Sequence, residues 1–209
     1  MAINIQYNGK VVLRKKFNNN IKTITVTNNG TENLFKYLCW HLVGANTDSV
    51  NYLRPYFVDI KVVTETVDEN EETVKSYDNA LYQKVPLNGI QAYRYSALAN
   101  NDVEIEKLTG KYVTEFNCAI LGSNIQLTTL TGTYYEIQIY GQDKESLLAY
   151  AKLTYDTGRK DSNNKPVLEP IKSLNAPPNG ELLIQWFMYF GNYEPETEID
   201  DTQETGGNE

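Results

Sequence analysis

The side chains that most often do chemistry in proteins are few in this sequence, and they are not grouped. There is one histidine, His41, and there are two cysteines, Cys39 and Cys118. Cys39 and His41 fall in one predicted helix but two positions apart, so they point in different directions and do not form a metal site. His41 has neither a nucleophile nor an orienting acid in its sequence context. We therefore predict no metal, no catalytic histidine and two buried free thiols.

Longer catalytic motifs are absent from the sequence as well. There is no G-x-S-x-G, no H-E-x-x-H, no C-x-x-C and no phosphate-binding glycine loop. Glu104 and Glu106 share one face of a predicted strand, and we interpret them as facing solvent rather than as a glycosidase pair. The acidic stretch 67–76 lacks the glycine of an EF-hand calcium loop, which favours a solvated hairpin tip. The sequence thus predicts a protein that is not an enzyme and that has no cofactor.

Most of the chain has the pattern of β-strands. Tyrosine, threonine, valine and isoleucine are frequent, and these residues favour strands. Short strands at regular spacing, separated by glycines, predict a mainly β fold, an antiparallel β-sandwich. From residue 103 onward the runs of strand length cover 103–108, 111–120, 124–130, 134–141, 147–155 and 181–190.

The first part of the chain adds a hairpin and a helix. Alternating residues on both sides of Asn8-Gly9 predict a hairpin with a tight turn at that dipeptide. Residues 31–44 predict an amphipathic helix, in which leucines recur every four positions and Thr31 is the N-cap. We expect one sandwich domain over 1–192, with this helix at its flank.

Charge is distributed unevenly along the chain. The net charge is −8, but residues 193–209 carry seven acids and no base, whereas residues 1–22 carry five bases and no acid. The low hydrophobicity of 193–209 predicts a disordered tail, which either solubilises the protein or settles on a basic neighbour during assembly. Five positive charges are too few to predict nucleic-acid binding. No stretch approaches the roughly 20 apolar residues of a membrane span.

One predicted connection, residues 156–180, is unusually long. It has no periodicity, and loops beyond about 12–15 residues are uncommon in compact domains. Its prolines make it stiff and extended in places. We predict an arm that lies on a neighbouring subunit, with a plain surface loop as the alternative. The candidate contact residues are Arg159, Lys160, Pro166 and Pro170.

Two further stretches predict contact surfaces. The strand 181–190 is apolar on both faces, so the face with Phe187 and Tyr189 needs a cover from the helix, the long connection or a partner. The hairpin 134–156 has one apolar face and one polar face that is rich in tyrosine. Tyrosine suits interfaces because it combines a large contact area with a polar tip. We predict that this polar face contacts a partner, with an ordinary amphipathic sheet as the alternative; its candidate interface residues are Tyr134, Tyr140 and Tyr150.

Three stretches of the chain resemble structural proteins of tailed bacteriophages, especially small virion proteins at the base of fibres and in the collar or baseplate. They are TNNGTENLFKYLCWHLVGAN at 27–46, RPYFVDIKVV at 54–63, and the closing pattern YYEIQIYG…ESLLAYAKL…PIKSLNAPPNGELLIQWFMYF within 134–190. The first is similar to an early helix that follows an Asn-Gly turn, and the second to the strand after it. The sequence departs from the pattern at Gln138, where the family has glycine, and in the length of 156–180.

The resemblance implies an antiparallel β-sandwich without a cofactor, which assembles with copies of itself, as a trimer or a ring, and with other virion structural proteins. It implies a location in the virion. Because the first residues show no signal-peptide pattern, we expect synthesis in the cytoplasm of the bacterial host.

The sequence leaves two classes of function open. The first is a non-enzymatic virion protein, a connector or fibre-anchoring protein of the tail, collar or baseplate, with a capsid-decoration or head-fibre protein as the alternative. The second is a carbohydrate-binding module for glycans of the host surface. Sugar sites need aromatic side chains around a concave pocket, whereas an assembly surface is broad and flat. The tyrosines that would stack on sugars are Tyr93, Tyr95, Tyr134, Tyr140 and Tyr150.

Overall fold

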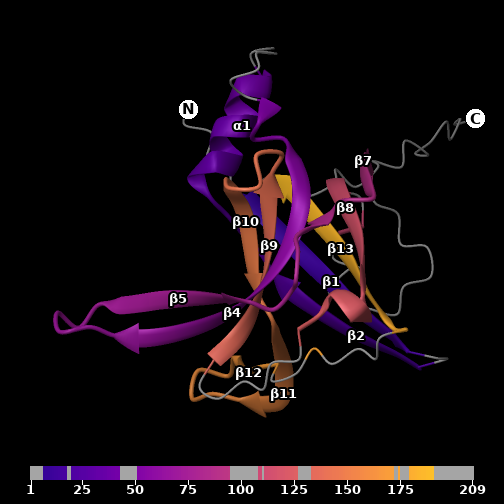
Figure 1. Ribbon diagram of the computed structural model, residues 1–209. Coiled ribbons are helices and arrows are strands. Elements are labelled where there is room, and N and C mark those ends of the chain that lie inside the picture. Colours follow the sequence, from indigo (N-terminus) through magenta and orange to yellow (C-terminus); the bar gives the residue numbers. More distant parts are fainter. Residues whose placement is uncertain are drawn as a thin grey trace, which may run out of the picture.

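Two antiparallel β-sheets face each other in the computed structural model of the chain, and helix α1 lies at one end of this sandwich (Figure 1). The expected fold class, a mainly β antiparallel sandwich with one amphipathic helix, is confirmed. The structure describes residues 7–17, 20–42, 51–94, 108–109, 111–126, 133–171, 174 and 179–190.

The strands form two large sheets and one small one. Sheet A has the order β2-β1-β13-β8-β7, with bounds Asn20–Thr27, Tyr7–Phe17, Glu181–Phe190, Tyr112–Leu121 and Gly89–Arg94. Sheet B has the order β3-β10-β9-β4-β5, with bounds Asn29–Gly30, Leu147–Lys152, Thr133–Gly141, Pro55–Val67 and Thr73–Asn79. The short strand β6, Val85–Pro86, pairs with β4, and β11 and β12, Thr154–Lys160 and Pro166–Pro170, form a separate hairpin.

The core lies between the two sheets and follows the period-two pattern of their strands. Alternate residues of β13 point inward and are buried, and they meet buried residues of β4 and β9 from the other sheet. Full burial of one such large apolar side chain stabilises the fold by about 1.5–3 kcal/mol. The inward side chains at the centre are Leu182, Ile184, Trp186 and Met188 of β13, Val58, Ile60 and Val62 of β4, and Ile137 and Ile139 of β9.

The helix prediction is confirmed in position, and Thr31 stands directly before the helix, where its carbonyl accepts from the N–H of Phe35 at 3.3 Å. Helix α1 covers Glu32–Leu42, and Leu34 is buried in the core. The Thr31 side chain also donates to sheet B: its hydroxyl lies 2.6 Å and 3.0 Å from the carbonyl oxygens of Leu147 and Leu148. This contact ties the start of the helix to strand β10. The predicted helix end at Gly44 lies outside the described residues.

The turn predicted at Asn8-Gly9 is wrong, because β1 runs straight through this dipeptide. A Cβ atom at Gly9 would lie 2.2 Å from the side-chain amide of Asn28. Asn28 is buried, and its amide nitrogen donates to the carbonyl of Phe187 at 3.4 Å. Glycine is therefore needed at position 9 because the Asn28 side chain packs directly against the backbone there, and not because the chain turns.

Part of the connection predicted as irregular is a regular hairpin. Residues 154–170 form β11 and β12, and the turn closes where Asp161 and Lys165 pair through their backbone at 2.8 Å. Almost every side chain of this hairpin is exposed or half-buried, so it has no apolar face that could produce periodicity in the sequence. A long proline-containing connection between β10 and β13 remains, as expected.

Two of the predicted strands differ from the structure. In the run 124–130, Asn124 is the last residue of a 3-10 turn, Gly122–Asn124, and Ile125 makes an isolated bridge to Leu81. Residues 127–130 lie outside the described residues. Of the run 103–108, which contains Glu104 and Glu106, only Leu108 is described.

We expect Gly9→Ala to lower the free energy of unfolding by about 1–3 kcal/mol, the usual cost of overpacking a filled site. Gly89→Ala is the matched control, because a Cβ there would meet Asn117 at an ordinary 3.7 Å. Urea denaturation of both variants measures the difference. Equal stability of the two variants would contradict the assigned role of Gly9.

Candidate interaction surfaces

The titratable and nucleophilic side chains of the described residues are dispersed over the fold. No group of three or more histidine, cysteine, aspartate or glutamate side chains is placed to hold a metal ion among these residues. Of the two thiols that were predicted to be buried, Cys118 is buried and Cys39 is exposed. Burial raises the pKa of Cys118 to about 12, so its thiol stays protonated. In the described ranges, no helix has the length and apolar character that crossing a membrane requires.

The polar face of the hairpin 134–156 is continued by the strands on either side of it. Gln138 of β9 lies opposite Asp59 of β4 and Tyr150 of β10. Glu136 lies opposite Lys61 and Lys152 in the same way. We name the resulting surface the tyrosine–lysine face: Asp59, Lys61, Tyr134, Glu136, Gln138, Tyr140, Tyr150 and Lys152.

The centre of the tyrosine–lysine face is a closed polar layer rather than an open surface. Asp59, Glu136 and Gln138 are each no more than 2% exposed. The hydroxyl of Tyr140 donates to Oε1 of Gln138 at 2.6 Å, and Nε2 of Gln138 donates to Oε1 of Glu136 at 2.7 Å. Lys61 pairs with Asp59 at 2.9 Å. Buried polar groups that satisfy one another in this way are stable inside a protein.

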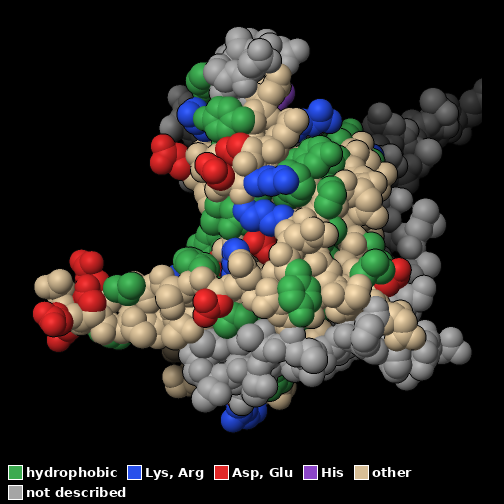
Figure 2. Space-filling view, in the orientation of Figure 1, with side chains coloured by type: hydrophobic (Ala, Val, Ile, Leu, Met, Phe, Trp, Pro, Cys, Tyr) green, Lys and Arg blue, Asp and Glu red, His purple; other side chains and the backbone are tan. Residues whose placement is uncertain are grey.

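Lysine side chains cover the tyrosine rings of this face. The ammonium group of Lys84 lies 3.2 Å from the ring centroid of Tyr140, and that of Lys152 lies 3.9 Å from the ring of Tyr134. Such cation–π contacts are worth about 0.5–2 kcal/mol. In the view of Figure 2, basic side chains gather at mid-height of the molecule, with hydrophobic side chains around them. Desolvation by burial lowers the pKa of Lys84 and raises that of Tyr140 to about 12.

The outcome for the three predicted interface tyrosines is therefore mixed. They do lie on one face, as the alternation predicted. Tyr134 is buried at 5% exposure, so it offers no surface to a partner, and its hydroxyl donates to Glu65 at 2.7 Å. Tyr140 and Tyr150 are half-buried. Because their own lysines cover Tyr134 and Tyr140, these rings are not free to stack on sugars.

The second face of β13 is covered by the chain itself. Phe187 is 2% exposed and packs with Val12, Leu108 and Val113 in a small cluster outside the main core. Among the described residues the cover is Leu108, and neither helix α1 nor the described part of the long connection belongs to this cluster. Phe187, a predicted interface residue, is thus buried within the single subunit. Tyr189 is half-buried at the edge of this cluster.

Beside this cluster lies a buried carboxylate that sequence reasoning missed. Glu115 of β8 is 3% exposed, and it accepts from the Tyr93 hydroxyl at 2.5 Å and from the amides of Gln91 and Gln185 at 2.8 Å and 2.9 Å. Burial by itself raises the pKa of Glu115, but side-chain hydrogen bonds, including one from Asn117, outweigh it and hold the pKa below its ordinary value. In the sequence, Glu115 looks like any outward residue of an alternating strand.

The residues predicted on the long connection lie together on the β11–β12 hairpin. Arg159, Lys160 and Pro166 are exposed, and Pro170 is half-buried. Arg159 forms an ion pair with Glu169 across the hairpin. The hairpin lies at the end of the sandwich opposite helix α1 (Figure 1), where it forms a projecting arm.

A second arm was only partly foreseen. Strands β4 and β5 continue beyond the sandwich as a two-stranded hairpin that points away from the body (Figure 1). Its acidic tip is a tight turn, as predicted, in which Asp68 accepts from the N–H groups of Asn70 and Glu72. Every residue from 65 to 79 is exposed, including Val67 at 69% and Val74 at 47%. The sequence predicts two strands and a turn here, but it does not indicate that they extend beyond the sandwich.

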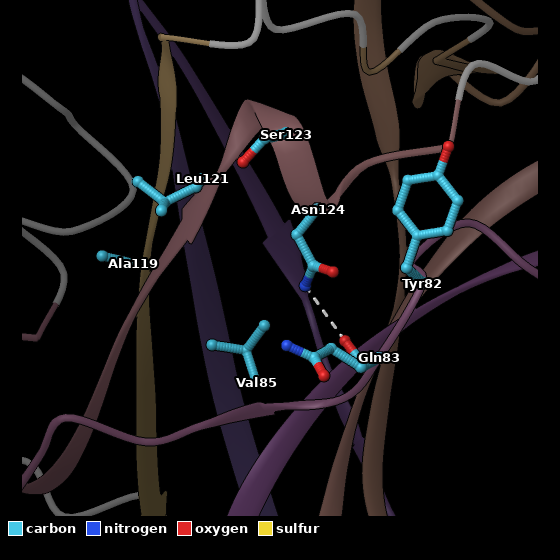
Figure 3. A pocket seen from close by; sticks show the side chains of 7 residues that line it. All are labelled: Tyr82, Gln83, Val85, Ala119, Leu121, Ser123 and Asn124. Atoms are coloured by element: carbon cyan, nitrogen blue, oxygen red, sulfur yellow. Dashed lines mark hydrogen bonds between the residues drawn. The ribbon is translucent and has the colours of Figure 1, made fainter.

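A cleft of about 450 Å³ opens beside strand β8 (Figure 3). Tyr82, which is 70% exposed, stands on one side, and the amide of Asn124 donates to the carbonyl of Gln83 at 3.0 Å. The lining carries no charged side chain. Its residues are Tyr82, Gln83, Val85, Ala119, Leu121, Ser123 and Asn124.

The edge of β8 is open at this cleft. Strand β7 pairs with β8 only as far as Asn117, so Ala119 and Leu121 lie beyond its end. The N–H of Gly122 donates toward β13, to Gly180 at 2.8 Å. Backbone groups alternate between the two sides of a strand, so those of Ala119 and Leu121 point toward the cleft. Within the described residues, this stretch can accept another strand.

Comparison with known proteins adds no relative. No protein-family model matches the chain, and neither the curated proteins nor the solved structures contain a match. The arguments about function therefore rest on the sequence and on the geometry of these surfaces.

We expect Glu115→Gln to lower the free energy of unfolding at pH 7 by about 1.5–3 kcal/mol, the range for hydrogen bonds to a charged group. The pKa of Glu115 is depressed in the folded state, so its stabilisation is present above the unfolded pKa of about 4.3 and is lost as pH falls through the lower folded pKa. Urea denaturation from pH 7 to pH 3 should show that the difference in free energy of unfolding between the unchanged protein and Glu115→Gln becomes smaller. Glu72→Gln, at the exposed arm tip, is the control. If this difference stays constant with pH, the charge of Glu115 contributes nothing to stability.

Proposed function

We propose that this protein is a non-enzymatic structural subunit of a tailed-bacteriophage particle, which docks to copies of itself and to other virion structural proteins. The observation that carries the docking function is the β4–β5 arm. A free two-stranded hairpin is at best marginally stable in water. The arm nevertheless leaves the sandwich with all of residues 65–79 exposed, valines included. A neighbouring subunit would cover these side chains and hold the arm in place.

The other surfaces agree with such a function. The β11–β12 hairpin is a second projecting arm, and it exposes Leu168 at 57% and Tyr155 at 42%. The open edge of β8 at Ala119 and Leu121 can receive a strand from another chain, a common mode of protein recognition. Two arms and a receiving edge on one small protein favour contacts with several neighbours over the binding of one small ligand.

The virion setting is supported by the sequence resemblance of 27–46, 54–63 and the closing strands within 134–190. The antiparallel sandwich is the fold that this family implies. Within the particle, a connector or fibre-anchoring protein of the tail, collar or baseplate is the proposed role, because arms that reach outward suit a part that joins different proteins. A capsid-decoration or head-fibre protein is the alternative position.

A second candidate function, a carbohydrate-binding module, is favoured by one observation, the cleft in Figure 3. It combines an open aromatic ring, Tyr82, with the amides of Gln83 and Asn124 and the hydroxyl of Ser123, which are the side chains that sugar sites use. Of the tyrosines predicted for this role, Tyr95 lies outside the described residues, Tyr134 and Tyr140 are covered by lysines, and Tyr93 donates to Glu115.

The docking function predicts that the purified chain forms a defined oligomer, a trimer or a ring. We expect the double variant Val67→Thr and Val74→Thr to shift the mass toward the monomer without changing thermal stability, because both side chains are exposed in the single subunit. Light scattering after size exclusion measures the mass. Tyr112→Thr is the control, since Tyr112 is as exposed as Val67, at 69%, but lies off the arm.

Two results would count against this function. A monomer at every concentration would overturn self-assembly, and an oligomer that the arm variant leaves intact would remove the arm from the contact.

The carbohydrate alternative is tested on the same protein with an array of bacterial surface glycans. On the docking function we expect no bound glycan. Binding that Tyr82→Ala abolishes, and that Tyr112→Ala on sheet A preserves, would transfer the function to the cleft, since stacking on an aromatic ring is the main contact there.

A further inference from the structure

We propose that the outer edge of strand β5 binds the same edge of a second copy, antiparallel and about a two-fold axis at Ser76. This inference rests on the proposed docking function of the β4–β5 arm, and it adds the partner surface and its register. The pairing would join two arms into one sheet with the strand order β4-β5-β5-β4. Such a contact is closed by itself, and in a trimer or a ring it would join two of these assemblies with dihedral symmetry.

Strand β5 is an edge that lacks the usual protection. It ends the order of sheet B, so among the described residues its ladder is with β4 alone. All seven residues of Thr73–Asn79 are exposed. Proteins blunt such edges with proline, a bulge or several charges. Strand β5 has no proline, one lysine and one aspartate, and its register with β4 runs without a shift. This edge is therefore able to pair with another strand.

The backbone groups of alternate β5 residues point away from β4. At the turn, the N–H of Asp68 donates to the carbonyl of Glu72 at 2.9 Å. At the body of the sandwich, the N–H of Ala80 donates to the carbonyl of Ile60 at 3.0 Å. Even-numbered residues of β5 are therefore the hydrogen-bonded positions of the ladder with β4. The odd-numbered residues direct their N–H and C=O groups outward, and they are Thr73, Lys75, Tyr77 and Asn79.

Other contacts set both ends of this outer edge. The tight turn at Asp68 precedes it. After it, the carbonyl of Ala80 accepts from the N–H of Gln126 at 2.9 Å, so the edge is occupied from that residue on. The open part is thus Thr73–Asn79. Two identical antiparallel strands pair over their whole length only when the central residue, here Ser76, lies opposite its own copy.

The side chains favour the same register. It places Lys75 of each copy opposite Tyr77 of the other, and a lysine beside an aromatic ring is a favourable pair. Lys75 can take part, because in its own subunit its ammonium group lies 3.8 Å from Glu65 and its side chain is 34% exposed. A two-fold axis at Lys75 would place two lysines opposite each other, which destabilises a strand pair. An axis at Tyr77 would leave the first two residues of each strand unpaired.

Disulfide trapping tests this register in the full chain. In a Cys39→Ser background, which removes the exposed native thiol, we expect Ser76→Cys to form a covalent dimer under mild oxidation. Ser76 and its copy would form a non-hydrogen-bonded pair, whose Cα atoms lie about 4.5 Å apart, and a disulfide can span this distance. Non-reducing electrophoresis measures the dimer.

Matched cysteines on the same strand supply the controls. In the proposed register Val74 lies opposite Asp78 of the second copy. We therefore expect Val74→Cys and Asp78→Cys to stay monomeric on the gel when each is oxidised alone, and to form a mixed dimer when the two proteins are combined. A covalent dimer from Lys75→Cys or Tyr77→Cys in place of Ser76→Cys would overturn the inference, as would the absence of a dimer from all of these variants.

Charge at position 77 provides the second measurement. We expect Tyr77→Lys to weaken association about tenfold by sedimentation equilibrium, because it places lysines opposite each other at two symmetric positions. Tyr77→Glu is the matched variant: it removes the same ring, which is 48% exposed, but it places a carboxylate opposite Lys75 and should associate more tightly than Tyr77→Lys. Tyr112→Lys, at an exposed position off the arm, should associate as the unchanged protein does. Equal association of the two Tyr77 variants would contradict the proposed register.

The outcomes separate this inference from the proposed function. An oligomer that Val67→Thr with Val74→Thr disrupts, but that gives no Ser76→Cys dimer, would sink the β5–β5 contact and leave docking by the arm standing. A monomer under all conditions would remove both.

Discussion

The fold depends on the insertion of one strand, β13, into the middle of sheet A. It pairs along its length with β1 on one side and with β8 on the other, so it joins the first strand of the sheet to strands from the middle of the chain. Its inward side chains fill the space between the sheets, and Phe187 on its other face anchors the small outer cluster. Few positions on this strand face water on either side. Such long-range pairing must bring distant parts of the chain together before any contact is gained.

The two sheets bury their polar groups in different ways. On sheet A, one carboxylate, Glu115, is held ionised by uncharged hydrogen-bond donors. On sheet B, Asp59 and Glu136 are buried beneath lysines that lie across the strands and over the tyrosine rings. Both arrangements satisfy the buried charge within the chain, which is the condition for burying it at all. Neither arrangement leaves its carboxylates open to solvent.

The parts of the protein that remain open are its edges and arms. Strands β4 and β5 extend past the sandwich, and β11 and β12 form a hairpin of their own. Beyond Asn117, β8 has no partner on its β7 side among the described residues. Exposed strand edges invite association, and isolated proteins usually protect them. Here they occur in a chain whose acidic and basic residues are unevenly distributed along its sequence. A subunit with these properties is suited to an assembly whose neighbours protect its edges, and the closed faces of the sandwich then act as a rigid support.

Most of the strands, their faces and the helix could be predicted from the sequence, because period-two and period-four patterns depend only on near neighbours in the chain. It correctly placed β4, β8, β9 and β13, and it grouped Tyr134, Tyr140 and Tyr150 on one face. What covers each face could not be predicted in this way: in the structure, lysines lie over the rings of Tyr134 and Tyr140, and Leu108 covers Phe187.

The same limit explains the local errors. Gly9 looked like a turn residue in the sequence. The contact that requires glycine there is with the side chain of Asn28, which follows the neighbouring strand β2 and is distant in the chain. The β11–β12 hairpin left no pattern because it buries no face. Contacts between residues far apart in the chain decide burial, pairing and open edges, and a single sequence carries no local record of them.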